Sequence, residues 1–124
     1  MRTETLSYIA DSLESLGVPY SFMEWKGKVP ETYFVGEYQE TESVSEDGEQ
    51  ESQFILTGTT RGSFLSLEQY KETIEDKIES TAILDSGSGV AIFYGYSFPV
   101  PTGDAALKRI QINLTVKEWK VKKQ

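Results

Sequence analysis

Apolar residues near the N-terminus recur at the spacing of one helix face. They are Leu6, Ile9, Leu13 and Leu16, separated by three, four and three positions, as in an amphipathic helix. Gly17 follows where helices often end in a left-handed residue, and Pro19 cannot continue the helix. The pattern predicts a helix of about 13 residues that must pack against another element, because a helix of that length is marginal alone.

Five later segments have the composition and alternation of β-strands. They cover residues 20–25, 33–38, 53–60, 90–98 and 108–120. In the fourth segment, alternation places Val90, Ile92, Tyr94, Tyr96 and Phe98 on one face. In the last segment, aliphatic residues from 110 to 116 alternate with polar residues from 109 to 115, which is typical of a strand with one face in water.

The sequence Ser-Leu-Glu-Gln at 66–69 has the pattern of a capping box, the start of a second helix. Leu65 and Tyr70 stand at the two positions of the matching hydrophobic staple. Apolar residues continue at helical spacing to Ile78. We therefore expect a helix over residues 66–80.

The predicted order of elements is α-β-β-β-α-β-β. Strands joined by short turns pair antiparallel, and two amphipathic helices against such a sheet define an α+β domain. We expect a single domain over residues 1–124, with an antiparallel or mixed sheet of about five strands and both helices on one face. The polar stretch at about 40–52, with its Asp47-Gly48 turn signal, is expected to be a loop or arm.

Charge is concentrated in two segments. The chain carries 20 Asp+Glu and 12 Lys+Arg, a formal net charge of −8. Residues 37–51 hold seven acids and no base, whereas residues 108–124 hold six bases and one acid. The simpler interpretation is solvated surface. The functional interpretation is that one molecule carries two complementary patches.

The composition excludes several kinds of chemistry. The chain has no Cys and no His, so disulfides, thiolate metal sites and Ser-His-Asp or Cys-His catalysis are impossible. The Ser-Gly-Ser-Gly sequence at 86–89 lacks the Lys-Ser/Thr of a phosphate loop, and the acidic stretch misses the register of a calcium loop. The acids lie in polar sequence that offers no burial to tune them. We expect no enzymatic activity, cofactor or metal.

The sequence gives no indication of a membrane or of tight nucleic-acid binding. No apolar h-region follows the first four residues, and no apolar stretch has the length of a membrane span. An acidic chain is not expected to grip the phosphate backbone. The expected compartment is a reducing cytoplasm.

Aromatic residues are dense between positions 20 and 38. Core packing is the simpler interpretation of such a cluster. Because a strand presents both faces, we expect some rings to be exposed, and exposed aromatics on a small domain favour a protein interface. The candidate exposed contacts are Trp25, Tyr33, Tyr38 and Trp119.

Together these features resemble the tail terminator family, the small tail-completion or head–tail joining proteins of long-tailed bacteriophages and prophages. The shared features are a helix ending in Leu-Gly-Val-Pro at 16–19, an aromatic strand, a Pro30-x-x-Tyr33 lead into the next strand, and a polar excursion around 40–52. A strand, the helix at 66–80 and two closing strands containing Phe-Tyr-Gly-Tyr at 93–96 complete the order. The resemblance covers most of the chain, and none of its motifs is catalytic.

The resemblance implies a structural virion protein, assembled in the cytoplasm of the bacterial host. Such proteins form a ring, typically a hexamer, that caps the tail tube protein, contacts a head-completion or connector protein and lets DNA pass without specific binding. Rings are built from head-to-tail contacts, so we expect the acidic stretch of one subunit to lie beside the basic last strand of its neighbour. The candidate interface residues are Glu40, Glu42, Glu46, Asp47, Glu49, Glu51, Lys108, Arg109, Lys117 and Lys120.

Two alternatives stay open at the level of the sequence. Within the same class, the chain could be another neck, minor tail or head-completion protein. In a different class, an acidic inhibitor that mimics DNA would use the charge of −8, although mimicry requires carboxylates arrayed over a rigid surface. Rings with an open centre would favour the tail terminator, whereas a monomer that binds a nuclease would favour the inhibitor.

Overall fold

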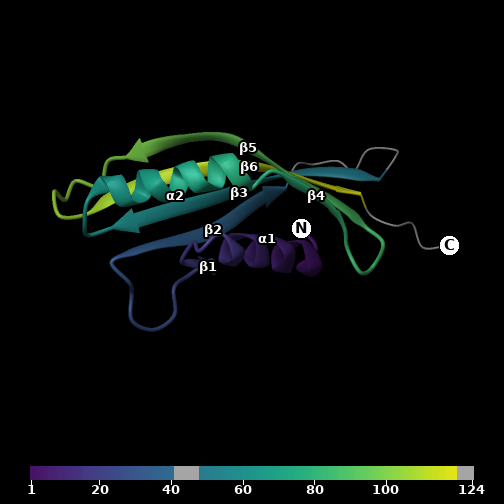
Figure 1. Cartoon of the computed structure of the whole chain (residues 1–124), viewed down its shortest axis with the longest axis horizontal. Helices are drawn as coiled ribbons and strands as arrows, with labels where there is room; N and C mark the ends of the chain where they lie inside the picture. Colours follow the sequence, from purple (N-terminus) through teal and green to yellow (C-terminus); the bar gives the residue numbers. More distant parts are fainter. Residues whose placement is uncertain (41–47, 120–124) are drawn as a thin grey trace.

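Two helices and six strands make up the described part of the chain. The computed structural model describes residues 1–40 and 48–119, and Figure 1 shows how its elements are arranged. The helices are α1 (Thr3–Ser15) and α2 (Phe64–Lys77). The strands are β1 (Tyr20–Phe22), β2 (Thr32–Glu40), β3 (Glu49–Thr60), β4 (Ser80–Ile83), β5 (Gly89–Val100) and β6 (Lys108–Trp119).

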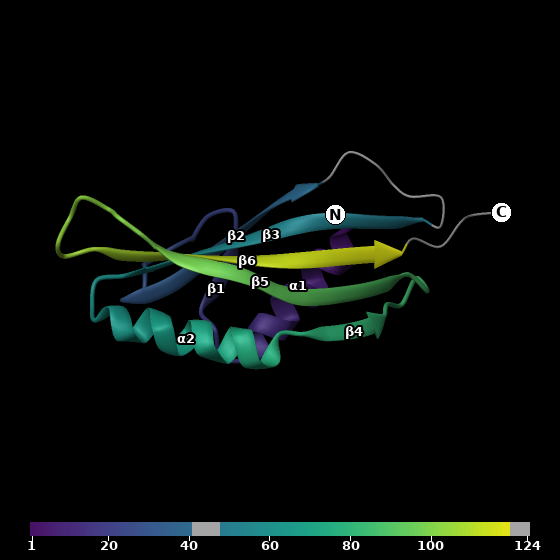
Figure 2. The ribbon, with the colours of Figure 1, turned by 90° about the horizontal axis from the view of Figure 1, so that it is seen from above.

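The strands form one sheet in the order β1-β2-β3-β6-β5-β4, which Figure 2 shows from above. Neighbours pair antiparallel except β1 and β2, which are parallel. The α+β class is confirmed, but the described residues form a six-stranded mixed sheet rather than about five strands. The sequence pattern does not reveal β4, because its four residues follow α2 closely and give too short an alternation. The connection between β1 and β2 is too long for a tight hairpin and returns the chain parallel to β1.

The end of α1 confirms the sequence prediction. The helix has 13 residues, and Gly17 takes the left-handed conformation at φ 78°. The Val18 N–H donates to the Leu13 carbonyl at 3.0 Å and the Gly17 N–H to the Glu14 carbonyl at 2.9 Å. These two bonds are those of a Schellman motif, so the local sequence is enough to end this helix.

The start of α2 differs from the prediction. The N-cap is Ser63, whose hydroxyl accepts from the Leu65 N–H at 3.2 Å, so the capping box at Ser66 is wrong. Beginning the helix three residues earlier brings Phe64 against the core. The helix also ends at Lys77, not at 80, which frees Ser80 to begin β4.

Both helices pack on the same face of the sheet, as predicted. The Tyr8 hydroxyl of α1 bonds the Ser80 hydroxyl of β4 at 2.8 Å, and the Tyr70 ring of α2 meets the Phe34 ring of β2 edge-on at 5.6 Å. A single core lies between the layers. Its fully buried members include Ile9, Leu13, Phe34, Phe54, Leu56, Leu67, Ile74, Ile92, Ile110, Ile112 and Leu114.

Tyr20 makes the stability sensitive to alkaline pH. Its ring packs 6.3 Å from that of Phe54, and burial raises the pKa of the hydroxyl from 10.0 to about 12. Between those values the unfolded chain has lost this proton while the folded chain keeps it, so the free energy of unfolding falls as pH rises. Below pH 10 this contribution is constant.

The check is urea unfolding of the wild type and of Tyr20→Phe at about pH 9 and about pH 11.5. The two proteins differ only in the hydroxyl of residue 20, so the comparison isolates Tyr20. We expect the variant to lose less free energy of unfolding between the two pH values. Equal losses would contradict the assignment.

Candidate protein-interaction site

A bulge in β5 decides which of its side chains face outward. The pairing with β6 shifts between Tyr94 and Tyr96, which leaves Gly95 as an extra residue. Tyr94 therefore lies on the helix-covered face, whereas Tyr96 and Phe98 lie on the opposite one. The predicted alternation, which put both rings on one face with Val90, is wrong.

Gly95 is the residue that makes the bulge possible. A Cβ at this position would lie 2.7 Å from the backbone oxygen of Asn113, closer than a side chain allows. A glycine inside a strand pattern indicates a bulge or a close backbone approach. This glycine is the signal in the sequence that could have revealed the outward rings.

Three aromatic side chains of β5 form an exposed row, here called the aromatic stripe: Phe93, Tyr96 and Phe98. Their exposed fractions are 40%, 59% and 41%. The Tyr96 and Phe98 rings stack, with centroids 6.1 Å apart and planes 15° from parallel. The stripe lies on the face of the sheet opposite the helices, called the open face, which no described helix covers. Exposed apolar rings grouped in this way mark a contact surface.

The acidic stretch and the basic last strand meet within one chain. β3 pairs with β6 in a register that places Glu51 opposite Lys117. The Glu49 carboxylate lies 3.5 Å from the Lys117 ammonium group. Glu40 pairs with the amino group of Met1. The structure thus supplies an internal partner for part of each patch, and the predicted contact between neighbouring subunits stays a prediction.

The two ends of the basic strand differ in their surroundings. Lys108 and Arg109 begin β6 at the hairpin turn that follows β5, at the opposite end of the sheet from Glu49 (Figure 2). Neither is part of an ion pair among the described residues. The remaining candidates Glu42, Glu46, Asp47 and Lys120 lie outside the described residues.

The four aromatic side chains expected to be exposed are half-buried. Trp25 packs against Tyr33 at 5.7 Å, and Tyr38 stacks on Phe22 at 6.2 Å. Trp119 lines a hollow of about 320 Å³ beside the edge strand β4. Each ring finds a neighbour within its own chain, so the aromatic stripe offers more free surface than these four residues. Their part in an interface stays a prediction.

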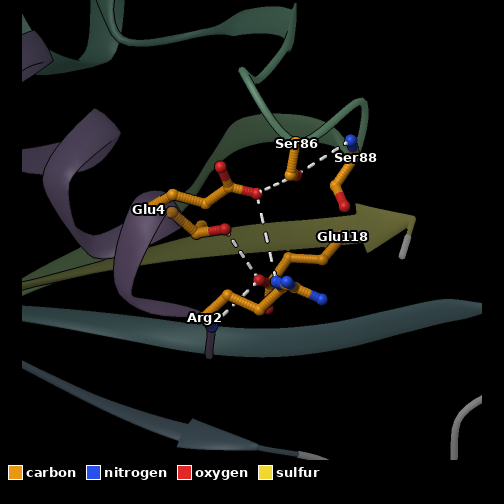
Figure 3. Close-up of polar contacts among 6 residues, drawn as sticks. Arg2, Glu4, Ser86, Ser88 and Glu118 are labelled. Carbon is orange, nitrogen blue, oxygen red and sulfur yellow. Dashed lines mark hydrogen bonds and ion pairs between the residues drawn. The ribbon is translucent and has the colours of Figure 1, made fainter. Parts of the chain in front are cut away.

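A buried carboxylate joins the last strand to the start of α1 (Figure 3). Glu118 is 1% exposed, and its Oε2 accepts from the Thr5 hydroxyl at 2.7 Å and the Arg2 backbone N–H at 3.1 Å. Nearby, the Glu4 carboxylate accepts from Ser86 and lies 3.9 Å from Arg2 Nε. Sequence reasoning counted Glu118 only as a charge on the basic strand. Its contacts fix α1 on the sheet and leave the carboxylate inaccessible to a substrate.

The described residues contain no cluster of three or more acidic side chains that could hold a metal ion. No helix within 1–40 or 48–119 has the length and apolar character to cross a membrane. No protein-family model and no curated protein matches the sequence.

Proposed function

We propose that the protein is a structural component of a tailed bacteriophage or prophage virion, which assembles as a ring at the head-proximal end of the tail tube, as tail terminators do. The observation that carries the proposal is the aromatic stripe on the open face of the sheet. An uncovered sheet face with grouped aromatic rings is suited to binding another protein subunit.

The size of the stripe favours a subunit contact. Three aromatic side chains of about 200 Å² each, close to half exposed, offer about 300 Å². A stable interface buries about 800 Å² per partner. The stripe is therefore the apolar centre of a larger contact, and the polar remainder of the open face supplies its rim.

The test compares the wild type with Tyr96→Ser/Phe98→Ser by native mass spectrometry and negative-stain electron microscopy. We expect the wild type to form rings with an open centre and the variant to stay monomeric. Val29→Ser is the matched control, because Val29 is 48% exposed but lies in the loop between β1 and β2. It should form rings like the wild type.

Far-UV circular dichroism of the three proteins is the check that the substitutions leave the fold intact. Rings that persist in the double variant would contradict the role of the stripe. A wild-type monomer that binds and inhibits a nuclease would instead support the DNA-mimic inhibitor, the alternative from a different class of proteins.

A further inference from the structure

An apolar hollow with a basic rim lies where the β5–β6 turn meets the start of α2. Its volume is about 420 Å³. Phe64, Val100 and Leu107 supply apolar surface, and Lys108 and Arg109 complete the wall. Figures 1 and 2 both place this turn at one extreme of the long axis, away from the end to which β2 and β6 point. The hollow is large enough for a branched apolar side chain, with cations placed to meet carboxylates beside it.

The cations of this rim lack acidic partners within the described part of the chain. Arg109 Nε is buried without a hydrogen-bond partner there, and the Lys108 ammonium group donates to the Ala105 carbonyl at 3.2 Å. Lys117, at the other end of the same strand, is paired with Glu49. A half-buried guanidinium group with no acidic partner is suited to binding a carboxylate of another molecule, because Arg–carboxylate hydrogen bonds are among the strongest that side chains form.

The chain's own acidic stretch cannot supply that anion to its own hollow. Glu40 aligns across β3 with Val116 of β6, and the seven-residue step from there to Arg109 is about 23 Å along the strand. Two residues of chain span at most about 7 Å, so Glu42 cannot bring its carboxylate from Glu40 to Arg109. Glu46 and Asp47 start from Gly48, which precedes a residue aligned with Trp119, further still. Any contact between the two must join different copies.

We propose that the hollow receives the acidic segment 40–48 of a second copy, with Val44 in the apolar hollow and the flanking carboxylates on Lys108 and Arg109. The sequence from 41 to 47 is Thr-Glu-Ser-Val-Ser-Glu-Asp, one branched apolar residue between acids, which matches the hollow in both polarity and charge. The contact joins different surfaces of the two copies, so it repeats head to tail. This proposal rests on the proposed ring and identifies one contact between the subunits of that ring.

The first test is carbodiimide cross-linking of an equal mixture of unlabelled and ¹⁵N-labelled chains. Links from Lys108 to Glu42 or Glu46 are expected, and about half of them should join a labelled to an unlabelled chain if the chains mix at random. The matched control is the Glu49–Lys117 pair, 3.5 Å apart within one chain, whose links should join chains of one label. Rings without Lys108 links would overturn the contact and leave the proposed function standing.

The second test changes the charges of the hollow and the charges of the segment in separate variants. Lys108→Glu/Arg109→Glu and Glu42→Lys/Glu46→Lys are each expected to weaken self-association about tenfold or more by analytical ultracentrifugation. Mixed one to one, the two variants should regain assembly, because the native segment of one meets the native hollow of the other and the two reversed surfaces carry complementary charges. A chain carrying all four changes should regain assembly.

Other outcomes are equally decisive. Unchanged self-association of either double variant would overturn the contact. Links between copies that build open chains instead of rings would support the contact and contradict the ring. A wild-type chain that stays monomeric at roughly 1 mM would overturn the contact, since that concentration detects even weak self-association.

Discussion

Phe34→Ala is expected to lower the free energy of unfolding by about 3–5 kcal/mol, the usual range for truncating a buried phenylalanine. Phe34 is fully buried, and its ring lies over Gly58 on β3. A Cβ on Gly58 would lie 2.8 Å from Cδ2 and Cζ of that ring. The same ring meets Tyr70 edge-on at 5.6 Å, so the truncation removes a contact between the sheet and α2. Urea unfolding followed by circular dichroism measures the effect.

Gly58 provides the control, because the absence of a side chain at this position leaves room for the Phe34 ring. Gly58→Ala alone should destabilise by about 1–3 kcal/mol through overpacking. In the Phe34→Ala background the added methyl group meets no ring and fills part of the cavity, so it should be neutral or stabilising. A double-mutant cycle measures this coupling. Additive effects of the two substitutions would contradict the packing argument.

Elements whose ends are set by neighbouring residues could be predicted from the sequence. The spacing from Leu6 to Leu16 and the stop at Gly17 fix α1 locally, and the structure confirms both. α2 offered two serines in reach, Ser63 and Ser66, and the choice between them depends on burying Phe64 against a core that a local pattern does not contain. Tertiary packing therefore determines which of the two serines is the N-cap of α2.

The outward face of β5 could not be predicted by alternation. One inserted residue reverses the facing of every side chain that follows, and the insertion at Gly95 exists only relative to β6. The same limit applies to charge. The sequence shows an acidic and a basic segment, but only the sheet order places Glu49 beside Lys117 and leaves Arg109 at the far end. That separation is the observation from which the proposed contact between copies is argued.

Glu118→Ala is expected to lower the free energy of unfolding by about 2–4 kcal/mol. The carboxylate accepts two hydrogen bonds, from the Thr5 hydroxyl and the Arg2 backbone N–H, and bonds to a charged acceptor contribute about 1.5–3 kcal/mol each. A negative charge at the start of α1 also stabilises the helix through a favourable interaction with its dipole. The desolvation of a buried charge offsets part of this sum, which keeps the expected loss below the full value of both bonds.

The matched control is Glu49→Ala, which removes an acidic side chain at the same end of the sheet. Its ion pair with Lys117 is partly exposed and should contribute less than about 1 kcal/mol. Thr5→Val and Glu118→Ala together form a double-mutant cycle. Both changes remove the hydrogen bond between the Thr5 hydroxyl and the Glu118 carboxylate, so we expect a coupling energy of about 1–2 kcal/mol. If Glu118→Ala unfolds like Glu49→Ala, or the cycle shows no coupling, Glu118 does not anchor α1, and the buried carboxylate is only tolerated by the fold.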